Sequence, residues 1–413
     1  MTCFRLRFFL SFTVLLSVAG CAIDPMHNSV PTQLSERAVV DGFPADIRSW
    51  SDEARDDLAQ TIQDRVARYK QENAEYFAEY KHYPPMNYLA LSGGSSSGAF
   101  AAGALSGWSK SGARPQFSVV TGVSTGALIA PFAFLGPQYD ETLRTEYTTV
   151  HSDNIFLSDV WTVLKGLRGG LSFADNTPLK KRIDTELTQQ VLDAIAVEHR
   201  KGRRLLIVTT NLEAQRGVVW NIGRIANSRN PKRLDLVKQI MLASAAVPGM
   251  FEPVLINVDI EGKNYQEIHV DGGVTSQVFL FPLQTSRMDK EAFAKSGIER
   301  NLYIIRSGKV SAEYEAIKPT AISLSQRSLD SIIKYQAVGD LYRLYIAAQR
   351  DGMNYKLLYI PPQFNEKSKE IFDPDYMRKL FEIGCAEGVK GIDWVSEPPG
   401  YGYTDAKVKA QAR

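Results

Sequence analysis

One short segment constrains the fold of this 413-residue chain more than any other. An apolar strand at 117–120 runs straight into the pattern Gly-x-Ser-x-Gly at 122–126, and an apolar helix follows at 125–135. A strand can turn this sharply into a helix only past small side chains, which Gly122 and Gly126 supply. Ser124 then stands at the helix N-terminus, where the helix dipole favours a developing anion. The context predicts a nucleophile elbow, whereas the five residues alone would fit an ordinary glycine-rich turn.

The rest of the chain predicts an α/β fold. Short apolar strands alternate with helices from residue 88 onward, which favours a largely parallel sheet with helices on both faces. The content of 44% hydrophobic and 23% charged residues is ordinary for a globular protein and excludes a disordered, collagen-like or polytopic membrane chain. We expect strands at 88–91, 117–120, 205–210, 254–258, 268–270, 302–305 and 357–360, and helices near 99–111, 125–135, 176–198, 232–246, 323–349 and 374–388.

A loop of small residues follows the strand at 88–91. The backbone N–H groups at Gly93, Gly94 and Ser95 can converge there on an anion. A nucleotide phosphate loop is excluded, because Ala99-Phe100 stands where that loop needs Lys and Ser or Thr. An oxyanion hole for acyl transfer fits better, since its donors are backbone groups.

A serine nucleophile needs a base, and Asp271 is the candidate. It ends the strand at 268–270 before Gly272-Gly273, and none of the five histidines has such a place. A triad in the order Ser, Asp271, His is excluded because no histidine follows Asp271. A carboxylate that is held close and partly desolvated can take the serine proton directly, whereas a simple Asp-Gly turn is the alternative. We expect His269 to pack or to hydrogen-bond within its strand, and we expect no metal or organic cofactor, because no Cys/His cluster has metal-ligand spacing.

These motifs resemble those of the patatin-like phospholipases, in the same order. They are Gly93-Gly94 with Gly98, the elbow at 122–126, a segment at 243–251 and Asp271-Gly272-Gly273. The resemblance covers roughly residues 88–290 and implies a three-layer α/β/α fold. It also implies a lipid acyl hydrolase of the phospholipase or lysophospholipase type. Ser124 and Asp271 would form its catalytic dyad, which works through an acyl-enzyme, and Gly93, Gly94 and Ser95 would supply the oxyanion donors.

The small-residue loop departs from the family pattern at two positions. Ser95 stands where the family has its third glycine, and Ser97 stands where it usually has a basic residue. The missing cation predicts weaker activity or a less anionic substrate. Two alternatives therefore stay open: a non-catalytic lipid-binding or assembly lipoprotein, and a small-ester or peptide hydrolase built on the same dyad.

The N-terminus has the layout of a bacterial lipoprotein signal. Arg5 and Arg7 precede an apolar stretch that is too short to span a bilayer, and small residues then lead to Cys21. The segment at 18–21 resembles a lipobox, in which the signal 1–20 is removed and Cys21 is acylated. Several acyl chains give lasting attachment. Ala22 in place of Asp predicts passage to the outer membrane, on its periplasmic or surface side.

Charge and spacing divide the remaining chain. Once the arginines of the signal are set aside, 46 basic residues balance 46 acidic ones, so no nucleic-acid partner is expected. We expect a lipidated tether at 21–48, an N-terminal helix within 49–84 that Ser51 can cap, a hydrolase domain at 85–395 and a flexible tail at 396–413. Lipid is the expected substrate, and the membrane is reached through acylated Cys21.

Overall fold

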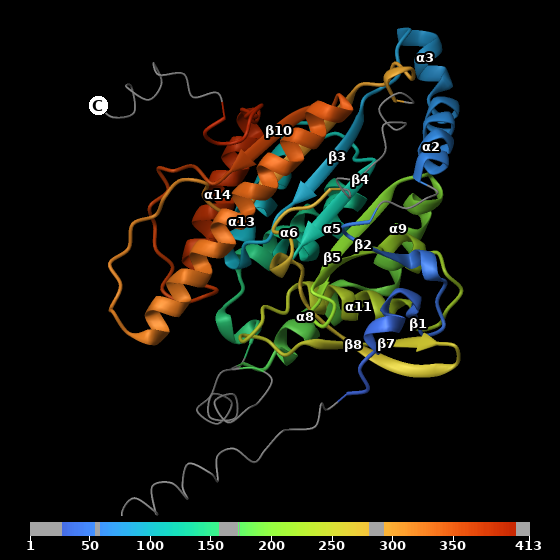
Figure 1. Cartoon of the computed structure of the whole chain (residues 1–413). Coiled ribbons are helices and arrows are strands. Elements are labelled where there is room, and N and C mark those ends of the chain that lie inside the picture. The colour runs from blue at the N-terminus through green and yellow to red at the C-terminus, as the bar shows by residue number, and fades with distance from the viewer. Residues whose placement is uncertain (1–26, 54–57, 157–171, 173, 281–292, 402–413) are drawn as a thin grey trace, which may run out of the picture.

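The fold is a sheet covered by helices on both faces, a three-layer α/β/α arrangement (Figure 1). The computed structural model describes residues 27–53, 58–156, 172, 174–280 and 293–401. Its strands are β1 (Val39–Val40), β2 (Arg48–Trp50), β3 (Met86–Leu91), β4 (Val119–Val123), β5 (Arg204–Asn211), β6 (Arg216–Asn221), β7 (Val254–Ile260), β8 (Lys263–Asp271), β9 (Arg300–Arg306) and β10 (Asn354–Tyr359). Its helices are α2 (Leu58–Glu72), α3 (Ala74–Tyr80), α4 (Gly98–Lys110), α5 (Thr125–Leu135), α6 (Asp140–Thr148), α8 (Thr177–Glu186), α9 (Gln189–Arg200), α10 (Ile222–Ala226), α11 (Arg233–Ser244), α13 (Ala321–Asp351) and α14 (Pro374–Lys390).

The sheet is parallel in one part and antiparallel in the other. Its main order is β1-β7-β8-β5-β4-β3-β9-β10, and the strands from β5 to β10 in this order run parallel. β8 joins antiparallel to β5, and β6 also pairs antiparallel with β5. β7 and β8 form a hairpin, so this side needs no crossover helix.

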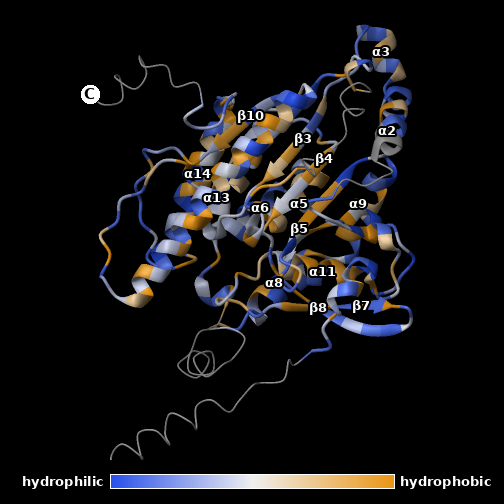
Figure 2. Ribbon diagram, viewed as in Figure 1, coloured by the Kyte–Doolittle hydropathy of each residue, from blue (hydrophilic) through white to orange (hydrophobic). Residues whose placement is uncertain are grey.

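Side chains of the central strands alternate between two cores. Leu89 and Leu91 pack on one face with α4, α5 and α14, whereas Tyr88 and Ala90 pack on the other with Leu341 and neighbouring residues of α13. The strands are accordingly among the most hydrophobic elements, while polar residues lie on the outer helix surfaces (Figure 2). This strict alternation with both faces covered is typical of a sheet buried between two helical layers.

Most predicted elements are confirmed, but one expected helix is divided, and β6, α6 and α10 were not predicted. The helix expected at 176–198 is two helices, α8 and α9, because Thr188 accepts a hydrogen bond from the Val191 N–H and starts a new helix. β6 was not predicted, although its residues Val218, Val219 and Trp220 have strand character.

The segment before the domain is part of the fold rather than a free tether. β1 pairs with β7, and β2 pairs with β6, so the prediction of a tether is wrong for residues 39–48. Trp50 ends β2 and Ser51 lies in a turn, whereas the helical part ahead of β3 is α2 and α3, broken at Asn73. Asp52 and Glu53 accept hydrogen bonds from the Arg216 guanidinium.

Several predictions fall outside the described residues. These are the signal at 1–20, the acylation of Cys21 and the tail beyond residue 401. Within the described part, no helix has the length and apolar character needed to cross a membrane.

Candidate active site

Ser124 lies in a strained turn between β4 and α5. Its φ of 55° and ψ of −125° place a non-glycine residue in a sparsely populated region of backbone space. The flanking glycines make room for this turn: a Cβ at Gly122 would lie 2.4 Å from the Gly126 carbonyl oxygen, and one at Gly126 would lie 2.4 Å from the Leu91 carbonyl oxygen. The serine hydroxyl is thereby presented at the N-terminus of α5.

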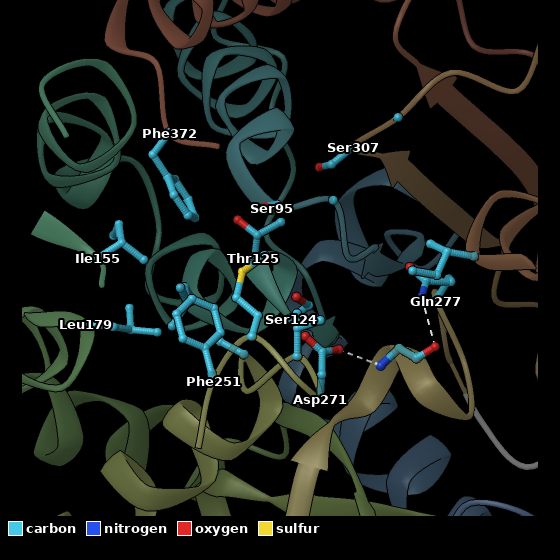
Figure 3. A pocket seen from close by; sticks show the side chains of 18 of the residues that line it. Ser95, Ser124, Thr125, Ile155, Leu179, Phe251, Asp271, Gln277, Ser307 and Phe372 are labelled. Atoms are coloured by element: carbon cyan, nitrogen blue, oxygen red, sulfur yellow. Dashed lines mark hydrogen bonds between the residues drawn. The ribbon is translucent and has the colours of Figure 1, made fainter. Parts of the chain in front are cut away.

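Asp271 faces Ser124 from the end of β8 (Figure 3). The strand register brings the two residues together, because β5 lies between β4 and β8. Val208 of β5 pairs with Val123 of β4, and Thr209 of β5 pairs with Asp271 of β8. The Asp271 side chain is buried, and its Oδ1 accepts a hydrogen bond of 2.7 Å from the Gly273 N–H. Its Oδ2 is buried and has no hydrogen-bond partner among the described residues. One carboxylate oxygen is therefore fixed and the other is left free on the side of the serine.

Burial raises the pKa of Asp271 to about 6. The nearby Ser124 hydroxyl and the Gly273 N–H oppose this by stabilising the carboxylate. Asp271 is thus mostly ionised at neutral pH and is more basic than an exposed aspartate, as general-base catalysis requires.

The segment at 243–251 holds both residues in place. The Ser244 hydroxyl accepts a hydrogen bond of 3.1 Å from the Ser124 N–H and donates one of 2.7 Å to the Val208 carbonyl oxygen. The Asp271 N–H donates to the Ala246 carbonyl oxygen at 2.9 Å. In the sequence this segment was notable only for its resemblance to the family, and no role was predicted for Ser244 or Ala246.

The three predicted oxyanion donors are not equivalent. The Gly93 N–H donates to the Gln277 carbonyl oxygen at 2.9 Å, so it is not free to bind an oxyanion, and the prediction is wrong for this group. The N–H groups of Gly94 and Ser95 have no acceptor among the described residues, and both residues line the cavity beside Ser124. Ser95 has a φ of 51°, so the backbone keeps here the left-handed conformation that suits a glycine.

Gln277 joins the two loops of the site, and no sequence pattern pointed to it. Its side-chain amide donates to the Gly273 carbonyl oxygen at 2.8 Å (Figure 3), and its backbone carbonyl oxygen accepts the Gly93 N–H. Asp340 of α13 accepts the Gln277 N–H at 2.7 Å. Gln277 therefore fixes the position of the turn after Asp271 relative to the small-residue loop.

Ser124 and Asp271 line a cavity of about 760 Å³. Apolar side chains from α8 and the segments around residues 251 and 372 form one side of it, including Leu179, Phe251 and Phe372 (Figure 3). Leu128 of α5 also lines the cavity. Arg306, Lys309 and Lys334 lie elsewhere in its lining. No described histidine lines it, and His269 instead hydrogen-bonds Glu267 and Thr209, as predicted for a residue held within its strand. No cluster of His, Cys, Asp or Glu in the described ranges could hold a metal ion.

Part of the chain is similar to a known protein family, and a larger part of it is similar to several solved structures. Residues 89–283 match the family model described as patatin-like phospholipase. No curated protein matches the chain. Among solved structures, VipD from Legionella pneumophila is similar at 12% identity and a TM-score of 0.33, over 74% of this chain and 66% of that one. Human GIVD cytosolic phospholipase A2 is similar at 10% identity and a TM-score of 0.31, over 77% of this chain and 52% of that one.

The matches thus span about half to two thirds of these two structures. The elbow, the small-residue loop and Asp271 all fall inside the matched residues. The chain is thus similar to the patatin-like phospholipase family over just under half of its length.

Proposed function

We propose that this chain is a lipid acyl hydrolase that cleaves carboxylic esters through a Ser124–Asp271 dyad. The observation that carries the proposal is the free Oδ2 of Asp271, buried beside a strained serine at the wall of a largely apolar cavity. Uncompensated buried oxygens are rare in folded proteins and call for a reason. A role as proton acceptor supplies one.

The geometry supports a two-step reaction. Ser124 Oγ attacks the ester carbonyl carbon while Asp271 Oδ2 takes the hydroxyl proton, and the N–H groups of Gly94 and Ser95 stabilise the oxyanion. The tetrahedral intermediate collapses to an acyl-enzyme as Asp271 returns the proton to the leaving alcohol. A water molecule, deprotonated by Asp271, then attacks the acyl carbon. The acyl–oxygen bond to Ser124 breaks, Asp271 returns the proton to Ser124 Oγ, and the fatty acid is released.

The cavity supports a lipid as the substrate. Its volume lies within the range of small-molecule sites, and its apolar side can remove an acyl chain from water. Phospholipid or lysophospholipid is the proposed class, and a small ester or a peptide would leave most of this apolar surface unfilled.

We also propose that acylation of Cys21 anchors the protein to the outer membrane. Asn28 is already docked, since its side chain donates to the Asn264 carbonyl oxygen at 2.7 Å. The linker from Cys21 is therefore only a few residues long and holds the domain close to the lipid. Incorporation of radiolabelled palmitate that persists in Cys21→Ser would overturn this proposal.

Hydrolysis of defined phospholipids, with fluorophosphonate labelling, tests the function. Labelling and fatty-acid release are expected in the wild-type protein, with both lost in Ser124→Ala and release lost in Asp271→Asn. Ser106→Ala is the matched control, because Ser106 is a buried serine of α4 that bonds only the Ala102 carbonyl oxygen.

Each other outcome is informative. Lipid binding without labelling would favour the non-catalytic lipoprotein. Labelling with a preference for short-chain esters over phospholipid vesicles would favour the small-ester hydrolase.

A further inference from the structure

Arg306, at the end of β9, is a buried cation beside the small-residue loop. It is 5% exposed and lines the cavity. One guanidinium nitrogen, Nη1, donates to the Gly93 carbonyl oxygen at 2.7 Å and to Ser92 Oγ at 3.2 Å. No carboxylate of the described residues lies within ion-pair distance of it. Burial lowers the pKa of Arg306 to about 10, so the group stays charged at neutral pH.

A buried cation that binds only neutral acceptors is costly. Its position beside the free oxyanion donors suggests what the cost serves. The Gly93 carbonyl belongs to the same peptide unit as the Gly94 N–H. A cationic donor on the carbonyl withdraws electrons from that unit and makes its N–H a stronger donor, as in other chains of polarised hydrogen bonds.

Ser307 extends the same wall. Its backbone N–H donates to Ser92 Oγ at 2.9 Å, and a Cβ at Gly94 would lie 2.1 Å from the Ser307 carbonyl oxygen, so β9 and the loop are in close contact. The Ser307 hydroxyl is buried, has no partner among the described residues, and lines the cavity across from Ser95 (Figure 3). It is an unused donor next to the free N–H groups of Gly94 and Ser95.

We propose that Arg306 and Ser307 complete the oxyanion site, which rests on the proposed hydrolase function. Arg306 is a positioning residue that fixes and polarises the Gly93–Gly94 peptide, and the Ser307 hydroxyl donates a further hydrogen bond to the oxyanion. The positive charge that Ser97 cannot provide thus comes from Arg306 at the end of β9. The sequence led us to expect a site without a cation. In this proposal the cation is Arg306, which acts through the Gly93 carbonyl oxygen.

Steady-state kinetics on an uncharged long-chain ester and on its thionoester test the pair. Sulfur is a weak hydrogen-bond acceptor, so a loss of oxyanion stabilisation lowers the ester rate more than the thionoester rate. We expect Arg306→Met and Ser307→Ala each to lower kcat on the ester by about tenfold or more, with KM nearly unchanged and a smaller loss on the thionoester. Arg306→Lys should restore part of the Arg306→Met loss.

Two controls separate this effect from damage to the fold. Arg203→Met removes another buried guanidinium that holds backbone carbonyls, at Phe117 and Phe134, away from the cavity. Ser106→Ala removes a buried hydroxyl. Both should leave kcat and the ester-to-thionoester ratio unchanged.

The inference is overturned if Arg306→Met lowers ester and thionoester rates equally, because that would show a purely structural role. It is also overturned if the loss appears only with phospholipid and not with the uncharged ester, because Arg306 would then bind the phosphate directly. In either case, a wild-type enzyme that requires Ser124 leaves the proposed function intact.

Discussion

Ser95 has a left-handed backbone in a loop where the family pattern has glycine. A φ of 51° costs a non-glycine residue about 1 kcal/mol or more, and no described acceptor compensates by taking the Ser95 N–H. We therefore predict that Ser95→Gly raises the free energy of unfolding by up to about 1 kcal/mol, measured by urea denaturation, while hydrolysis persists through the unchanged N–H.

Ser97 provides the control for that prediction. Its φ of −67° is ordinary, so Ser97→Gly relieves no strain. It adds freedom to the unfolded chain and removes a hydroxyl that lies 3.5 Å from the Tyr376 hydroxyl. Ser97→Gly should destabilise the protein by about 0.5–1 kcal/mol. Equal effects of the two substitutions would contradict the assignment of strain to Ser95.

Asp271 should set the pH dependence of both activity and stability. Because burial raises its pKa to about 6, kcat/KM on an uncharged ester should rise as the pH increases through 6 and then level off. A pKa above that of the unfolded chain means that the ionised carboxyl destabilises the fold, so its contribution to stability is favourable at low pH and is lost as the pH rises through 6.

Asp271→Asn should therefore be inactive but more stable than the wild type at pH 8, by up to about 3 kcal/mol, with little difference at pH 4. Thermal unfolding at the two pH values measures this. A variant that is less stable than the wild type at pH 8 would show that Asp271 is not a strained, functional carboxylate.

Local sequence patterns were sufficient to single out Ser124 and Asp271 as candidates, because each stands at a strand end beside glycines. They were insufficient for the partners of the loop. The hydrogen bonds that Gly93 donates to Gln277 and accepts from Arg306 depend on how β9 and the turn after β8 meet β3, and Arg306 is 213 residues from Gly93. Periodicity cannot report such contacts.

At the scale of elements, the pair α4 and α14 depends on glycines. A Cβ at Gly384 of α14 would lie 2.2 Å from the Phe100 carbonyl oxygen of α4, so the two backbones touch. Gly339 of α13 has open space where a Cβ would stand and an ordinary helical φ. Substitution by alanine should therefore have opposite effects on stability at Gly384 and Gly339.

Gly384→Ala should lower the free energy of unfolding by several kcal/mol, since backbone has to move to make room. Gly339→Ala should raise it by about 0.5–1 kcal/mol through helix propensity. Urea denaturation of both variants measures the difference. A neutral Gly384→Ala would mean that the helices do not pack this closely.

Strand and helix periods were enough to predict most of the element positions, and the errors have local causes. One residue, Thr188, divides a continuous apolar pattern into α8 and α9 by capping the second helix. Trp50 falls within the range expected for the N-terminal helix, 49–84, but pairing with Val218 of β6 places it in a strand. Pairing partners so distant in sequence leave no trace in a window of a few residues.

At the scale of the whole molecule, the N-terminal segment fastens the antiparallel side of the sheet. β1 and β2 cover β7 and β6, strands that would otherwise expose unpaired N–H and C=O groups. The polar, proline-containing composition of this segment suggested a tether, because two or three residues per strand are too few to show a period. A buried ion pair strengthens the attachment: Arg48 of β2 binds Glu267 of β8, and both side chains are almost fully buried.

Arg48→Met should therefore loosen the segment by leaving the Glu267 carboxylate buried without its cation, at a cost of about 3–5 kcal/mol at pH 7. Burial alone would raise the pKa of Glu267, but the hydrogen bond from His269 and the charge of Arg48 hold it at about 2. This carboxylate thus stabilises the wild-type fold above pH 4 and loses that contribution as the pH falls through 2, whereas in Arg48→Met protonation relieves the unpaired charge. The difference in melting temperature between the two proteins should narrow from pH 7 to pH 4.

Arg37→Met is the control, because it breaks the exposed ion pair with Glu261 on the β7–β8 hairpin. It should change the melting temperature little at either pH. An equal effect of both substitutions would refute the role of Arg48 in fastening the N-terminal segment.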